Sequence, residues 1–235
     1  MHSKYARLDR YLSQQLGIKR GDVRLMLARS RVRVNGVVAV AINQAVGEFD
    51  HVAVDGQVLQ AREPVYIMMN KPMGVVSATK DDEKNKTVID LLQRSDKNAL
   101  HIAGRLDFNS TGLLLLTNDG RWSRRLSEPA TKVMKWYRVR LQKPVTPDYI
   151  AAFAEGMYFS FEDITTLPAE LKIVSDYVAD VGLMEGRYHQ IKRMFGRFQN
   201  PVLELHRMAV GNLWLDDSLS LGESRELSAD ELEGI

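Results

Sequence analysis

The chain has 235 residues, of which 45% are hydrophobic and 26% charged, a composition typical of a soluble globular protein and not of a disordered one. It contains no cysteine, which excludes a disulfide scaffold and thiolate-bound metals, and no apolar run near the roughly 20 residues that span a membrane, so we expect a cytoplasmic protein. The net charge is only +2, but residues 1–36 hold nine Lys or Arg against two acids, whereas the last twenty residues hold seven acids against one arginine. This asymmetry predicts that the amino-terminal end meets a polyanion.

Residues 1–59 are expected to form a small module of two helices and short strands. Apolar residues at helical spacing predict a helix over residues 7–16, and Asp22 is expected to cap a second helix that ends near Ala28. Asn35-Gly36 and Asp55-Gly56 each lie between runs of valines, which predicts two hairpins. The helix pair would present basic side chains to phosphates, although a solvated basic face is the alternative. The predicted phosphate contacts are Lys19, Arg20, Arg24, Arg29 and Arg31.

Residues 60–64 carry no periodic pattern and end in proline, so we place a linker there and a second, larger domain over residues 65–235. The first apolar run of this domain ends in Asn70-Lys71-Pro72, where Lys71 is a candidate phosphate contact. A charged loop follows, and Thr87 is expected to cap a short helix formed by the apolar residues after it.

A tight polar turn, Ala103-Gly104-Arg105-Leu106-Asp107, precedes the apolar run of residues 113–116. Two charges beside a strand that must be buried are unusual, because an unpaired buried carboxylate costs several kcal/mol. Asp107 is therefore a candidate working group, with Arg105 two residues before it. The alternative is ordinary turn chemistry.

The remainder of the chain has the pattern of many strands and few helices. A short helix is expected around Trp122, the period-two alternation of residues 135–141 turns Tyr137 inward, and another helix is expected from Thr146 to about Glu155. Further strands are predicted at 168–175, 177–184, 201–206 and 213–215, and helical spacing occurs near 189–198. Because strands and helices do not alternate regularly, we predict an α+β domain on a mixed, mostly antiparallel sheet.

Three separated segments resemble the motifs of one family. They are Gly104-Arg105-Leu106-Asp107 followed by Ser110-Thr111-Gly112-Leu113-Leu114, then Lys135-Trp136-Tyr137, and then residues 185–195. In order and spacing they are similar to pseudouridine synthases, the enzymes that isomerise uridine within RNA. Asn70-Lys71-Pro72 resembles the first motif of this superfamily, and residues 7–58 resemble the αL RNA-binding module that several RNA-modifying enzymes carry. The resemblance implies the pseudouridine synthase fold.

The resemblance also assigns catalytic roles. It implies that Asp107 is the catalytic carboxylate, Tyr137 the active-site tyrosine and Lys192 the basic residue beside the aspartate. Many relatives have arginine in place of Lys192, and a lysine keeps the charge but loses the bidentate fork. Tyr137 would stack on a uracil that has left the RNA helix, while the ionised carboxylate acts as a nucleophile on the sugar or as a base on a ribose proton. From the residues alone, a core tyrosine and a solvated helix face remain the alternatives.

Further RNA contacts follow from the same resemblance. They are Arg105, Lys71, Arg187, His189, Gln190 and Arg193. Arg105 would fill the gap left by the flipped nucleotide or bind its phosphate. No His or carboxylate spacing predicts a metal site, and the isomerisation that the resemblance implies needs no metal, nucleotide or redox cofactor.

The version of the third motif in residues 187–195, followed by Glu204-Leu205-His206-Arg207, looks most like the branch that acts on small-subunit ribosomal RNA. We therefore expect a monomer that acts on this RNA, within a small-subunit assembly intermediate. The alternatives are a synthase acting on large-subunit RNA, a non-catalytic RNA-binding assembly factor, and a nucleoside or glycoside hydrolase that uses Asp107, for which Glu185 is a poor candidate as the second carboxylate.

Overall fold

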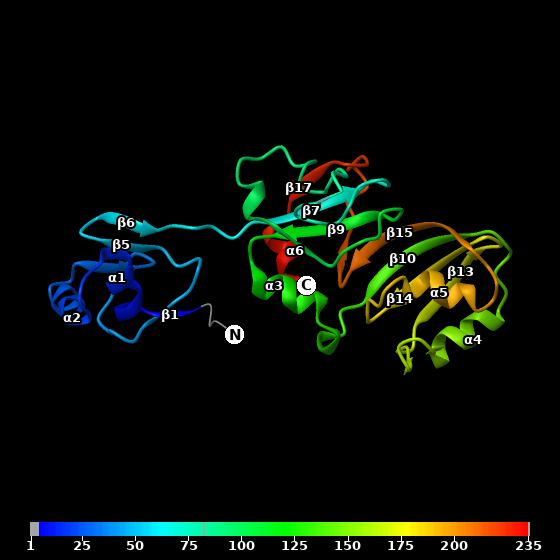
Figure 1. Cartoon of the computed structure of the whole chain (residues 1–235), viewed down its shortest axis with the longest axis horizontal. Coiled ribbons are helices and arrows are strands. Elements are labelled where there is room, and N and C mark those ends of the chain that lie inside the picture. The colour runs from blue at the N-terminus through cyan, green and yellow to red at the C-terminus, as the bar shows by residue number, and fades with distance from the viewer. Residues whose placement is uncertain (1–4, 82, 235) are drawn as a thin grey trace. The chain divides into compact units, whose positions relative to one another are not determined.

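A computed structural model describes residues 5–81 and 83–234. Contacts divide the chain into two compact units, residues 1–64 and residues 65–235 (Figure 1). In the two described ranges, no helix combines the length and the apolar character needed to cross a membrane.

In the first unit, two helices pack on a small antiparallel sheet. The helices are α1 (Leu8–Leu16) and α2 (Arg20–Ala28); the sheet has the order β3 (Val37–Val38), β2 (Val32–Val34), β5 (Val52–Val54) and β6 (Gln57–Gln60), and β1 (Ala6–Arg7) pairs with β4 (Ala45–Val46). Both predicted hairpins are present. Their turn residues have positive φ angles, 51° and 79° at Asn35-Gly36 and 51° and 82° at Asp55-Gly56, as two-residue hairpin turns require.

The start of α2 differs from the prediction. The helix begins at Arg20 with Lys19 in the N-cap position, so Asp22 lies inside its first turn. The Asp22 carboxylate accepts a hydrogen bond from the backbone N–H of Lys19 at 3.3 Å. Asp22 therefore caps the helix by reaching back from the third helical position, and the prediction that it is the N-cap residue is wrong.

The second unit is built on one large sheet. In its described part nine strands pair in the order β13 (Glu170–Ser175), β14 (Val178–Leu183), β10 (Lys135–Leu141), β15 (Val202–Val210), β9 (Thr111–Thr117), β7 (Tyr66–Lys71) and β17 (Ser224–Glu226), with β8 (His101–Ala103) on β9 and β16 (Leu213–Trp214) on β15. The β9–β15 pair is parallel and the other pairs are antiparallel. A separate hairpin joins β11 (Tyr158–Phe159) to β12 (Ile164–Thr165). The predicted α+β class on a mostly antiparallel sheet is confirmed.

Helices cover both ends of this sheet (Figure 1). They are α3 (Gly120–Ser127), α4 (Asp148–Glu155), α5 (Gln190–Gly196) and α6 (Ala229–Glu233), with 3-10 turns at Lys97–Ala99 and Pro129–Thr131. Leu114 of β9 belongs to the main core with Val139 of β10, whereas Leu113 belongs to a second core with Trp122 of α3. The leucine run of β9 is therefore buried on both faces, which explains its continuous apolar sequence.

The segment after Thr87 is a turn and not the predicted helix. The Asp90 carboxylate accepts hydrogen bonds from the backbone N–H and the hydroxyl of Thr87, at 2.8 and 2.9 Å. These bonds close the chain into a turn at the residues expected to start a helix. The apolar side chains that follow, among them Val88 and Ile89, are still buried in the main core.

One irregularity of the sheet positions the loop that carries Asp107. Strand β15 pairs with β9 at Thr111 and Gly112, while β8 pairs with Leu115–Thr117 further along the same strand. Strand β7 occupies one edge of β9. On the other edge of β9, β15 pairs near its start and β8 pairs near its end, so β8 and β15 are separated between these two pairings. The loop of residues 104–110 leaves the sheet where the two strands separate.

Candidate active site

The charged pair predicted from the sequence is present. The Nζ atom of Lys192 lies 3.1 Å from Oδ2 of Asp107, and each side chain is 31% exposed. The Nε2 atom of His189 lies 3.4 Å from the same oxygen. Lys192 comes from the first turn of α5 and His189 from its N-cap position, so one helix end supplies both neighbours of the carboxylate.

Asp107, Lys192 and Tyr137 border one cleft. Its open space is about 480 Å³, and Arg105, Arg187, His189 and Gln190 also line it. Tyr137 is 8% exposed and belongs to the main core. The inward-facing tyrosine that periodicity predicts is thus also a wall of the cleft, and the two interpretations of this residue are compatible.

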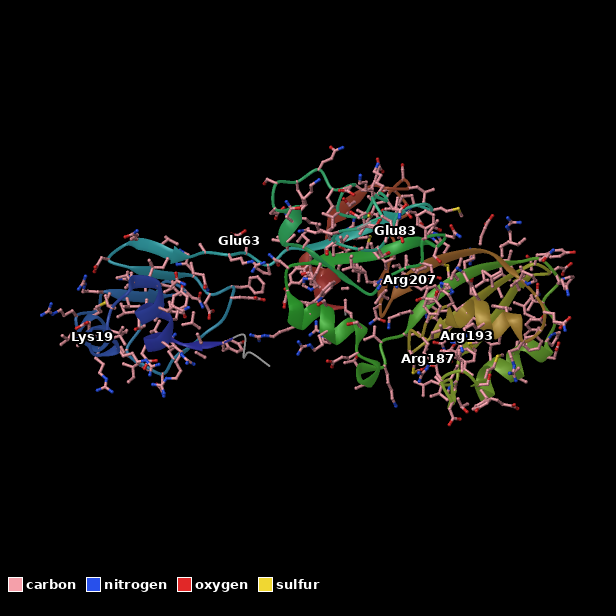
Figure 2. All side chains as sticks on the ribbon, viewed as in Figure 1. Lys19, Glu63, Glu83, Arg187, Arg193 and Arg207 are labelled. Carbon is pink, nitrogen blue, oxygen red and sulfur yellow. The ribbon has the colours of Figure 1, made fainter. Side chains whose placement is uncertain are left out.

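The loop that carries Asp107 is fixed by Arg207 of β15, which is labelled in Figure 2. Its side chain is buried, and its guanidinium donates hydrogen bonds to three backbone carbonyls, those of Leu113 at 2.7 Å, Gly104 at 2.8 Å and Arg105 at 3.4 Å. These carbonyls lie where β8 and β15 separate, so the fork of donors on arginine replaces the strand pairing that is missing there. No local feature of the sequence marks this residue as functional.

Lys71 holds the same loop at its other end. It is fully buried, and its Nζ atom contacts the backbone carbonyls of Pro72, Asp107, Phe108 and Ser110 at 2.9 to 3.4 Å. Burial lowers the pKa of Lys71 to about 8, and the charge of Asp107 opposes this shift. The prediction of a phosphate contact is wrong for Lys71, because its ammonium is enclosed by these carbonyls.

Gln190 also differs from its predicted role. It is buried, its side-chain amide donates to Oε1 of Glu185 at 2.8 Å, and its side-chain oxygen accepts from the backbone N–H of Arg187 at 3.1 Å. The prediction that Gln190 contacts RNA is therefore wrong, because its side-chain amide is bonded to the loop that precedes α5. Glu185 uses both carboxylate oxygens, because Oε1 also accepts from the Leu167 N–H and Oε2 accepts from Nε of Arg187. It does not provide the free second carboxylate that a glycoside hydrolase needs.

The other predicted RNA contacts fall into two groups. Arg105 and Arg187 are exposed at the cleft, whereas Arg193 donates from both terminal nitrogens to Glu162 at 2.6 Å. In the first unit the predicted residues are all exposed (Lys19 is marked in Figure 2). Arg31 donates through Nε to Asp55 at 2.9 Å. Carboxylates therefore offset the charges of Arg193 and Arg31, as Glu185 offsets that of Arg187.

Comparisons with known proteins agree with this geometry. A family model described as RNA pseudouridylate synthase matches residues 65–196. The ribosomal small subunit pseudouridine synthase A of Pseudomonas aeruginosa is 46% identical over 227 residues, which are 96% of this chain and 98% of the relative. The protein of the same name in Escherichia coli is 41% identical over 231 residues, 97% of this chain and 99% of the relative. A crystal structure described as a pseudouridylate synthase superposes with a TM-score of 0.71 and 37% identity, covering 99% of both chains.

Both the predicted fold and the predicted family are therefore confirmed. The chain belongs to the RNA pseudouridylate synthase family and is an RNA pseudouridine synthase, an isomerase.

Proposed function

We propose that this enzyme converts a uridine of small-subunit ribosomal RNA into pseudouridine, with Asp107 as the catalytic carboxylate. The observation that carries the catalytic assignment is the 3.1 Å contact between Asp107 and Lys192 in a cleft walled by Tyr137. The relatives named as small-subunit synthases, which align over almost their whole length, support the choice of RNA.

The two carboxylate oxygens of Asp107 have different surroundings. Lys192 and His189 both lie beside Oδ2, and no residue in the described ranges donates a hydrogen bond to Oδ1. The contact with Lys192 fixes the carboxylate through Oδ2, which leaves Oδ1 for the substrate. Oδ1 would attack C1′ of the ribose or remove a ribose proton, and both routes break the bond between N1 and C1′. The uracil then turns in the cleft and C5 bonds to C1′. In the first route the bond between Oδ1 and C1′ breaks at this step, in the second the abstracted proton returns to the ribose, and in both the proton on C5 is released.

The position of Asp107 in the cleft requires that the target nucleotide enters it. A base inside an RNA helix cannot place its glycosidic bond beside Asp107, so the target uridine has to leave the stack. Tyr137 would stack on the extruded uracil, and Arg105, exposed at the cleft, would fill the gap in the helix or bind the phosphate.

The first unit supplies affinity for the same RNA. We assign residues 1–59 to an RNA-binding module, residues 60–64 to a linker and residues 65–235 to the catalytic domain. The exposed side chains of Arg20, Arg24 and Arg29 would bind phosphates without reading the bases. We further propose that the enzyme acts as a monomer in the cytoplasm, on an assembly intermediate of the small subunit.

The direct test measures release of tritium from C5 of uridine. Small-subunit and large-subunit ribosomal RNA labelled at this carbon are incubated with the wild type, with Asp107→Asn, and with Asp176→Asn, a control at an exposed aspartate in the turn between β13 and β14. We expect release from small-subunit RNA with the wild type and with Asp176→Asn, and none with Asp107→Asn.

Each alternative gives a different result in this assay. Tritium release from large-subunit RNA alone would show that this RNA is the substrate. Release of free uracil would indicate that the enzyme is a hydrolase. Salt-sensitive binding without tritium release from either RNA would indicate a non-catalytic assembly factor. Full release with Asp107→Asn would contradict the catalytic role of this residue.

A further inference from the structure

Two exposed aromatic rings lie on segments that contact α5, the helix whose first residues line the cleft. Tyr188 is 76% exposed and Phe161 is 95% exposed. Each ring in water forgoes the free energy of burial, and two such rings on neighbouring segments offer a surface on which a flat ligand can stack. Neither residue takes part in the chemistry proposed for Asp107.

Tyr188 is connected directly to the reacting carboxylate. Its ring stacks on the imidazole of His189, with centroids 3.9 Å apart and planes 21° apart. The Nε2 atom of His189 lies in turn 3.4 Å from Oδ2 of Asp107. Tyr188 is thus the outer ring of a stack that begins at the catalytic group and ends in solvent.

Phe161 lies in the connection between β11 and β12, which contacts Arg193 of α5 through Glu162. Its neighbour Glu162 accepts two hydrogen bonds of 2.6 Å from Arg193, and the same Nη1 atom lies 3.4 Å from the backbone carbonyl of Tyr188. The guanidinium of Arg193 also lies 3.7 Å above the ring of Phe159. One arginine therefore ties the segment that carries Phe161 to the segment that carries Tyr188.

The surroundings of these rings favour a polyanion. Arg105 and Arg187 are exposed at the cleft, where Arg187 also pairs with Glu185 at 2.8 Å, and Lys192 lies 3.1 Å from Asp107. Exposed aromatic rings beside exposed cations form the usual surface for single-stranded nucleic acid, because bases stack on the rings while phosphates meet the cations. An apolar protein segment would find little continuous apolar surface between these arginines.

We propose that Tyr188 and Phe161 form a stacking platform for the unpaired bases on either side of the target uridine. This inference rests on the proposed function, because it takes RNA as the substrate. The platform would hold the neighbouring nucleotides out of the helix after the uridine has entered the cleft. It predicts a preference for targets in unpaired or easily opened RNA.

The test uses the full chain and a seven-nucleotide single-stranded RNA with one central uridine and 2-aminopurine at either neighbouring position, because stacking quenches the fluorescence of 2-aminopurine. The dissociation constant and the quenching are measured for the wild type, Tyr188→Ala, Phe161→Ala and Tyr188→Phe. The matched control is Tyr177→Ala. Tyr177 is exposed and directly precedes Val178, the first residue of β14. Val178 lies about 16 Å along the strand from Leu183, which lines the cleft.

We expect each alanine variant at the platform to raise the dissociation constant about 5- to 100-fold and to lose quenching at one neighbouring position. Tyr188→Phe and Tyr177→Ala should stay within about twofold of the wild type, because the first keeps the ring and the second lies elsewhere. Unchanged binding and quenching in both platform variants would overturn the proposal, as would an equal loss in Tyr177→Ala. Tritium release from ribosomal RNA is measured in parallel. If the wild type quenches 2-aminopurine but releases no tritium, the proposed isomerisation is refuted while the stacking platform is not.

Discussion

Replacing Lys192 by methionine tests whether its charge acts on Asp107 or on RNA. At a separation of 3.1 Å, two unit charges attract by about 1 kcal/mol in water-like surroundings and by about 5 kcal/mol at an effective dielectric constant of 20. About a third of each side chain is exposed, so solvent screening moves the value toward the lower figure. We expect Lys192→Met to lower kcat/KM by about 10- to 100-fold, which corresponds to about 1 to 3 kcal/mol.

The assay is the initial rate of tritium release from C5, measured over a range of RNA concentrations so that kcat and KM are separated. Lys192→Arg is the matched control, because it keeps the charge and should retain most of kcat. The melting temperatures of both variants should lie close to that of the wild type, since an ion pair that is about one-third exposed contributes only about 0 to 1 kcal/mol to stability. An unchanged kcat with a raised KM, and a salt dependence of RNA binding reduced by about one phosphate contact, would show that Lys192 binds RNA and would refute our reasoning.

Two further predictions concern the fold around the site. Gly112→Ala should unfold the second unit or prevent its folding. Gly112 has a φ of +102°, and an added Cβ would lie 2.3 Å from the backbone oxygen of Arg207. Circular dichroism and the yield of soluble protein measure the effect, and a melting temperature equal to that of the wild type would contradict the prediction. The hydrogen bonds from Arg225 lower the pKa of Glu231 to about 2, so this pair contributes stability above about pH 4.5 that is lost as the pH falls toward 2. In Arg225→Met the unfolding free energy, measured with urea at several pH values, should therefore decline less steeply over this window, and an unaltered slope would contradict the assignment.

Local patterns predicted much of the fold. The alternation in residues 135–141 gives the correct faces of β10, with Tyr137 and Val139 buried and Arg138 and Arg140 exposed. The asparagine-glycine and aspartate-glycine pairs gave both hairpins of the first unit, because only a narrow set of turns accepts positive φ at both positions. The Asp107–Lys192 contact was also predicted, through the resemblance of the segments that carry the two residues.

Other features depend on residues far apart in the chain and have no local signal. Lys71 resembles any surface lysine in sequence, and its carbonyl partners include Asp107 and Ser110, which follow it by 36 and 39 residues. Gln190 lies within a motif that resembles RNA-contacting segments, but its amide is used by Glu185, a residue considered in the sequence analysis only as a second carboxylate. Thr87 has the pattern of a helix cap, and the carboxylate of Asp90 closes a turn instead.

The two buried cations explain how a charged loop can exist beside a buried strand. To present its carboxylate at the cleft, the loop of residues 104–110 turns several backbone carbonyls inward, where β8 and β15 have separated and no strand can pair with them. Lys71 and Arg207 supply the missing donors, and the charges of Lys71 and Asp107 attract each other, which opposes the lowering of the Lys71 pKa by burial. A neutral donor in either place would satisfy fewer carbonyls, and in place of Lys71 it would also lose this attraction. The loop that carries Asp107 is therefore held by Lys192 at the cleft and by Lys71 and Arg207 inside the fold, so the core contributes to the position of this carboxylate.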